Sequence, residues 1–189
     1  MKKTNKIKFT LTLFLIVSFH SLFGQQIPNK FLGLMIGTSL DTFLESNPDA
    51  KEGQFWVLNT NISATGMTVY EITKSTSSGD KVQIDCCFKN SKLSIISVEY
   101  KDYQLSSDIL SGLKTKYGKY SKRFETGYKD FMNGQYRSVD IFKWSQNPNY
   151  ILEFDYTHGI GLAEIIFADK ASQSKIQQRK QKQNKSKIE

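Results

Sequence analysis

The chain runs twice through the same order of structural parts, and this repetition constrains its fold more than any other feature. Residues 33–100 predict a short helix followed by about four strands, and residues 105–168 predict the same series. Each half ends in a hairpin with a strongly apolar last strand, over 93–100 and 162–167. Because a small sheet must cover one face to be stable, each half pairs a helix with a sheet.

The similarity between the halves is architectural, because their residue identity is poor. Two readings follow from it. The halves are either two tandem helix-plus-sheet repeats, 33–100 and 105–168, or parts of one α+β domain that can be divided in this way without a true repeat.

Two short helices are predicted from capping residues and helical spacing. The first covers about two turns over 39–46, with Thr38 as its N-cap, apolar residues on one face and an Asn-Pro pair that ends it. The second begins at Ser106 or Ser107 and ends at Gly118, a residue suited to the position after a helix.

Alternation of apolar and polar residues predicts the strands. It is regular over 82–88, the pattern of a half-buried strand, and Asn90-Ser91 then makes a tight hairpin connection to the next strand. The predicted fold class is α+β, with two short helices and about eight mostly antiparallel strands. The other strands are expected over 54–58, 66–73, 93–100, 120–128, 136–144, 150–156 and 162–167.

The N-terminal residues have the order of parts of a secretory signal peptide. Lysines from Lys2 to Lys8 precede an apolar run over 9–19, and polar residues follow up to Gly24. This run of eleven residues, eight of them apolar, is too short for a membrane anchor, which needs about 20 apolar residues. We expect residues 1–25 to be removed on export, which leaves a periplasmic or secreted protein that is not transmembrane after processing.

The net charge of +8 lies at the two ends of the chain. Residues 26–169, the expected α+β domain, hold 15 basic and 17 acidic residues, whereas 170–189 hold seven basic residues and one acidic residue. This last segment has too few apolar residues to fold, so we expect a disordered basic tail. It either keeps the protein soluble or binds an anionic surface. We expect no nucleic acid as partner, because the tail has no aromatic residue to stack on a base.

One short motif carries a resemblance to known proteins. The segment Gly33-Leu-Met-Ile-Gly37-Thr-Ser-Leu-Asp-Thr-Phe resembles the start of the repeats in β-lactamase-inhibitor-protein-like and SmpA/OmlA-like envelope proteins, and the helix end at 113–118 is similar to theirs. Such repeats place a short helix before an antiparallel sheet. The chain lacks the cysteines that link some of those proteins. The resemblance implies a small exported bacterial module that binds or assembles, without fixing a target.

The candidates for chemistry are one thiol and one imidazole. Cys87 alternates with Cys86 in a strand and falls on the polar face, so we expect it to be exposed and to be a candidate reactive thiol. His158 lies in a hairpin turn. It is the base in our alternative function, a small secreted hydrolase, which requires Asp155 and a Ser, Thr or Cys87 beside it. The sequence predicts no metal site and no cofactor, because the single histidine after residue 25 and two diverging cysteines cannot form a close zinc site.

Aromatic residues are the better indication of function. Residues 26–169 hold nine Tyr, nine Phe and two Trp, which either fill the sheets or form a binding face. Our first hypothesis is an exported, non-catalytic binding or envelope-associated module whose partner is a protein or an envelope component. The residues expected at its contact surface are Tyr128, Phe131, Tyr136 and Trp144.

Overall fold

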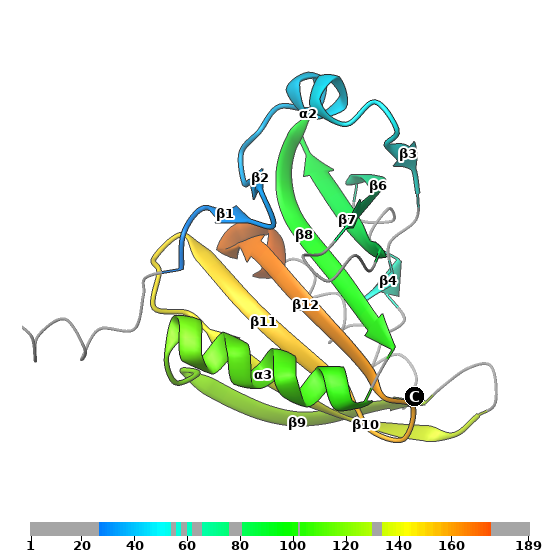
Figure 1. Ribbon diagram of the computed structural model, residues 1–189, viewed down its shortest axis with the longest axis vertical. Helices are drawn as coiled ribbons and strands as arrows, with labels where there is room; N and C mark the ends of the chain where they lie inside the picture. The colour runs from blue at the N-terminus through cyan, green and yellow to red at the C-terminus, as the bar shows by residue number, and fades with distance from the viewer. Residues whose placement is uncertain are drawn as a thin grey trace, which may run out of the picture.

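The protein has an α+β fold in which antiparallel strands dominate, as the computed structural model shows (Figure 1). The expected signal peptide lies outside the residues that the structure describes. Those residues are 27–53, 56–57, 60–61, 66–75, 81–101, 103–129 and 134–174.

Eight of the described strands form one sheet in the order β3-β6-β7-β8-β12-β11-β10-β9, and all neighbours in it are antiparallel. The predicted fold class is thus confirmed. These strands are β3 (Lys51–Glu52), β6 (Thr68–Ser75), β7 (Lys81–Lys89), β8 (Lys92–Lys101), β9 (Lys122–Lys129), β10 (Tyr136–Trp144), β11 (Tyr150–Thr157) and β12 (Leu162–Asp169). Two short pairs lie apart from it, β1 (Lys30–Phe31) with β2 (Leu34–Met35), and β4 (Trp56–Val57) with β5 (Thr60–Asn61).

The large sheet joins the two halves of the chain at its centre. β8 is the last strand of the first half and β12 the last strand of the second, and they pair with Val98 opposite Ile165 (Figure 1). From this central pair each half continues outward through its earlier strands. A tandem repeat predicts this arrangement. The repeat itself stays a prediction, because β4 and β5 have no described counterpart in the second half.

Helix α2 (Leu40–Ser46) covers nearly the predicted range, but its N-cap differs. The Ser39 hydroxyl accepts the backbone N–H of Thr42 at 3.2 Å, and Thr38 instead donates its hydroxyl to the Met35 carbonyl. Ser39 is the cap because its backbone is extended, as the position before a helix requires.

Helix α3 (Tyr103–Tyr117) begins earlier than predicted, so Ser106 and Ser107 lie inside it and do not cap it. It ends as expected at Gly118, whose φ of +77° suits a residue without a Cβ atom. No helix in the described ranges is long and apolar enough to cross a membrane.

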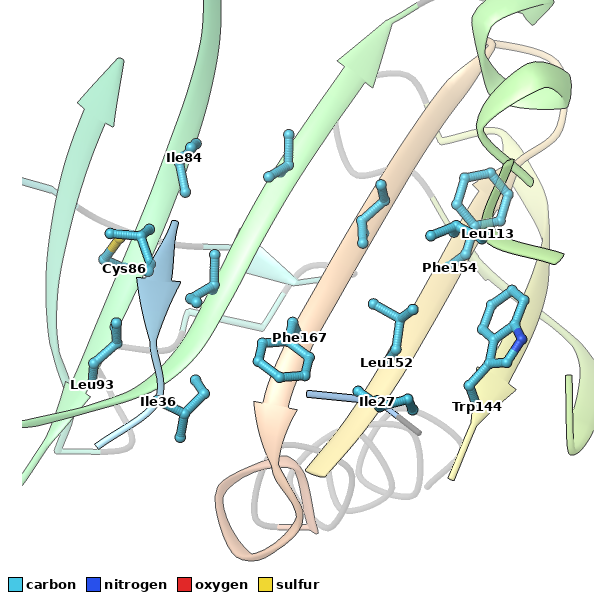
Figure 2. Close-up of a cluster of buried hydrophobic side chains, with 14 of the residues drawn as sticks. Ile27, Ile36, Ile84, Cys86, Leu93, Leu113, Trp144, Leu152, Phe154 and Phe167 are labelled. Carbon is cyan, nitrogen blue, oxygen red and sulfur yellow. The ribbon is translucent and has the colours of Figure 1, made fainter. Parts of the chain in front are cut away.

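The larger core cluster lies on the sheet face that contacts both helices, called here the helix face. Phe43 of α2 packs at 5.0 Å from the Phe88 ring, and Leu113 of α3 lies near Phe154 (Figure 2). Trp144 is fully buried in this cluster. Side chains from both halves line the helix face without a break, so the two halves share one core.

A second buried cluster occupies the other side of the sheet, called here the opposite face. Cys86 belongs to the helix face and Cys87, its neighbour in β7, to the opposite face, and both are fully buried. The expectation that Cys87 is exposed is therefore wrong, because apolar neighbours surround it on this side as well. The members of this cluster are Met67, Val69, Cys87, Ile95, Ile151, Ile166 and Ala168.

The chain continues after β12 as a short helical turn over 170–174. The Lys170 backbone N–H donates to the Asn149 carbonyl at 3.0 Å, and the side chains of Ser172 and Gln173 are buried. The folded body thus extends through this turn, beyond the boundary at residue 169 that the charge run predicts.

Candidate functional site

The outer strands of the second half carry a group of polar and aromatic side chains on the helix face. Asp140 of β10 lies opposite Glu125 of β9 on one side and Tyr156 of β11 on the other. Directly opposite residues of antiparallel strands point to the same face, so these side chains are neighbours. We call this group the β9–β11 surface. Its members are Arg123, Glu125, Tyr136, Asp140, Tyr156 and His158.

Asp140 links the charged members of the β9–β11 surface. Its Oδ2 atom lies 3.2 Å from His158 Nε2, and both of its carboxylate oxygens lie 3.3 Å from Arg123 Nη2. Arg123 also pairs with Glu125 at 3.3 Å. The Asp140 side chain is only 13% exposed, whereas its partners are about half exposed. The pairs contribute little to stability at this exposure, but they fix the orientation of the Arg123 and His158 side chains.

His158 is held at the start of the turn after β11. Its backbone N–H donates to the Ser138 carbonyl at 2.8 Å, and its ring lies edge-on to the Tyr156 ring at 4.8 Å. Asp155 precedes Tyr156 in β11, so it points to the opposite face, and Cys87 lies in β7. The hydrolase hypothesis requires Asp155 and a nucleophile such as Cys87 beside His158. The structure places neither Asp155 nor Cys87 there.

Tyr136 is the most exposed large apolar side chain among the described residues, at 72%. Its ring lies over Gly127 of the neighbouring strand, where a Cβ atom would overlap the Tyr136 hydroxyl and ring carbons. Because Gly127 has no side chain, the Tyr136 ring can occupy the space above β9 at this position. A rigid, amphipathic ring exposed in this way is a common contact residue at protein interfaces.

The four residues predicted at a contact surface are not all exposed. Trp144 is buried and donates its indole N–H to the Gly118 carbonyl at 2.8 Å, so the prediction that it belongs to a contact surface is wrong. Its position shares a face with Phe142, which the alternation in β10 already indicates. Tyr136 is exposed, the side chain of Tyr128 is not described, and Phe131 lies outside the described residues.

Arg123 and Asp140 were not among the residues predicted at a functional site. The signal was present in β10, where Asp140 shares a strand face with Phe142 and Trp144. A carboxylate that shares a strand face with buried apolar residues needs partners, and Arg123 and His158 supply them.

The cysteines have the properties of core residues. Burial raises the pKa of the Cys86 thiol to about 12 and raises the pKa of the Cys87 thiol well above its ordinary value. The thiolate is the nucleophilic form of cysteine, so neither residue has the character of a reactive thiol. The proposal of Cys87 as a reactive residue is not supported by its environment.

Within the described ranges, no three His, Cys, Asp or Glu side chains are grouped so that they could hold a metal ion. Comparison with known proteins gave no match to the chain from any family model, any curated protein or any solved structure.

Proposed function

We propose that the chain is an exported, non-catalytic binding or envelope-associated module that contacts a protein or another envelope component through the β9–β11 surface. The observation that carries this proposal is the exposed Tyr136 ring on the same sheet face as the fixed Arg123 side chain. Tyrosine and arginine are the residue types that contribute most often to binding at interfaces, and here both lie on neighbouring strands.

The position of β9 in the sheet supports the same proposal. β9 is the last strand in the order of the large sheet, and it covers eight residues. An edge strand of this length offers backbone groups to a partner strand, while charged residues on it oppose unspecific pairing. Lys122, Arg123 and Glu125 supply such charges. A partner is therefore selected by side chains as well as by the backbone.

Export is proposed from residues 1–25, which have the composition of a signal peptide. The periplasm or the exterior is then the place of action. The resemblance of the segment at 33–43 to repeats of β-lactamase-inhibitor-protein-like and SmpA/OmlA-like proteins agrees with a binding role in that compartment, and it remains a resemblance.

Site-specific photo-crosslinking tests the proposed surface. A photo-crosslinking residue replaces Tyr136 in one variant and Glu45, an exposed residue of α2, in the control. We expect a discrete crosslinked product with an envelope fraction only from position 136. Adding Arg123→Ala to the position-136 variant should weaken the product. Equal products from both positions, or none from either, contradict the proposed surface.

The hydrolase alternative gains an acid in Asp140 but no nucleophile. Among the described residues, the His158 ring contacts Asp140 and Tyr156, and no hydroxyl or thiol is hydrogen-bonded to it. A base needs a nucleophile within hydrogen-bond reach to start acyl transfer. Ester hydrolysis by the purified protein that is lost in His158→Ala would favour the hydrolase over the binding module.

A further inference from the structure

The outer edge of β9 is exposed and carries two opposite charges. β9 is the last strand of the large sheet and lies at the end of the sheet away from β6 (Figure 1). The side chains of Arg123 and Glu125 are 47% and 73% exposed, and they lie two positions apart on the helix face. The strand at the other end of the sheet, β3, covers only two residues. The long edge of this sheet is therefore β9.

The strand register indicates which backbone groups of β9 point outward. The His158 backbone N–H donates to the Ser138 carbonyl at 2.8 Å, so Ser138 of β10 directs its backbone groups toward β11. Successive residues of an antiparallel strand direct these groups to opposite sides. Ile141, three positions further along β10, therefore directs its groups toward β9, where Phe124 lies opposite it. The β9 residues whose N–H and C=O groups point away from the sheet are then Arg123, Glu125 and Gly127.

The two charges of β9 are arranged so that the strand matches a second copy of itself. Because outward-facing residues must pair with one another, a symmetric antiparallel pair of β9 strands is centred on a residue and not between two residues. With the centre at position 124, Arg123 of each copy lies opposite Glu125 of the other. A centre one position away would place two arginines or two glutamates opposite each other, which is unfavourable. Charge complementarity thus selects the register centred at position 124.

We propose that β9 pairs in this register with β9 of a second copy of the chain, so that two large sheets join into one. The inference rests on the proposed use of the β9 edge, and it names the strand that occupies this edge. Arg123 and Glu125 of the two copies then exchange about four backbone hydrogen bonds. Their side chains form two ion pairs, while Asp140 continues to hold each Arg123 guanidinium at 3.3 Å. Tyr136 and His158 lie on β10 and after β11, so the pairing does not use them.

Charge reversal tests the pairing with matched controls. Arg123→Glu leaves only acids at the two positions and Glu125→Arg leaves only bases, so each variant should weaken the dimer of the mature chain by roughly tenfold or more. An equimolar mixture of the two variants should form a dimer with one copy of each, because opposite charges then face each other again. Native mass spectrometry separates the mixed dimer from the others by mass. Glu45→Arg, on α2, is the control and should dimerise like wild type.

Three outcomes would overturn the proposed pairing. They are a wild-type chain that is a monomer at about 0.1 mM, a single charge-reversed variant that dimerises like wild type, and folded variants that form no mixed dimer. The contact with an envelope component is judged separately by the photo-crosslink from position 136. A monomer that gives this crosslink refutes the pairing alone, whereas a dimer that gives no crosslink refutes the envelope contact alone.

If a charge-reversed variant fails to fold, hydrogen exchange of the wild-type mature chain decides, followed residue by residue by NMR. The amide protons of Arg123 and Glu125 should exchange roughly tenfold more slowly at high than at low protein concentration, because the second strand covers them. The amide proton of Phe124, which faces β10, is the internal control and should not depend on concentration. Equal exchange of Arg123 and Glu125 at both concentrations overturns the proposal. Slowing that appears only when an envelope fraction is added also overturns it, since a strand of another protein is then the occupant.

Discussion

Trp144 of β10 closes the C-terminal end of α3 through Gly118. Its indole Nε1 atom donates to the Gly118 carbonyl at 2.8 Å, and its ring contacts the Tyr120 ring edge-on at 6.2 Å. The carbonyls at the end of a helix lack hydrogen-bond donors within the helix. The Trp144 side chain supplies such a donor from the sheet. The bond fixes α3 to the helix face at the point where the second half begins its strands.

Replacing Trp144 with Phe should lower the free energy of unfolding by about 1–3 kcal/mol. The substitution keeps an aromatic ring but removes the donor, which leaves the half-buried Gly118 carbonyl without its hydrogen bond. Urea unfolding followed by circular dichroism measures the change. Tyr136→Phe, at an exposed site, is the control and should stay within about 0.5 kcal/mol of wild type. Equal effects of the two variants would contradict this role of Trp144.

Replacing Lys143 with Met should lower the free energy of unfolding by about 3–5 kcal/mol, because Glu153 would remain buried without its cation. This loss is larger than that expected of a surface substitution. Glu153→Gln in the same chain removes that buried charge and keeps an acceptor for Gln173. The double variant should therefore recover at least about 2 kcal/mol relative to the sum of the single changes. Additive losses would show that the ion pair is not coupled.

Asp85 should make the protein less stable as the pH rises from about 4 to about 6. Desolvation raises its pKa in the folded protein from the ordinary 3.8 to about 6. In this interval the folded state keeps a proton that the unfolded chain has lost, so stability falls as the pH increases. Asp85→Asn should remove the effect and stabilise the protein at pH 8 by about 1 kcal/mol, allowing for solvent screening. Thermal unfolding at pH 4 and pH 8 checks this, and no difference in pH dependence would refute it.

Gly127 and Tyr136 should be energetically coupled across β9 and β10. In the wild type, the Cβ atom added by Gly127→Ala must displace the Tyr136 ring, so the substitution should raise the free energy of unfolding only slightly. In a Tyr136→Ala background the same change should stabilise the protein by roughly 0.5–1 kcal/mol, because glycine is unfavourable inside a strand. A double-mutant cycle by denaturant unfolding measures the coupling. A coupling energy of zero would mean that the ring does not occupy the space above Gly127.

Local signals predicted the individual elements well. The strand predicted over 136–144 is β10, and Gly118 ends α3 as expected. The tight connection at Asn90 and Ser91 is confirmed, with φ values of +51° and +57° at the two residues, as a two-residue hairpin turn requires. These features depend on residues close together in the sequence, which is why composition and spacing were sufficient.

Features that depend on distant residues were harder to predict. Cys87 was expected on a polar face because Gln83 and Asp85 precede it on the same side of β7. Further along β7 the same face is apolar, because the side chains beside Cys87 there come from other strands of the sheet and are hydrophobic. The consecutive Ile95 and Ile96 of β8 were the signal, since a strand with apolar residues on both sides is buried on both faces. The charged contacts of Asp140 likewise depend on the register of three strands.

The antiparallel pairing of β8 with β12 has a consequence for how the chain reaches its native state. The two strands lie more than 60 residues apart in sequence at paired positions such as Val98 and Ile165. If one half folds before the other, its β8 or β12 is an exposed apolar edge strand until the other half has folded. Such edge strands pair readily with other chains. Refolding yield should therefore depend on protein concentration, since a neighbouring molecule can donate its own C-terminal half to the waiting edge and produce an intertwined dimer.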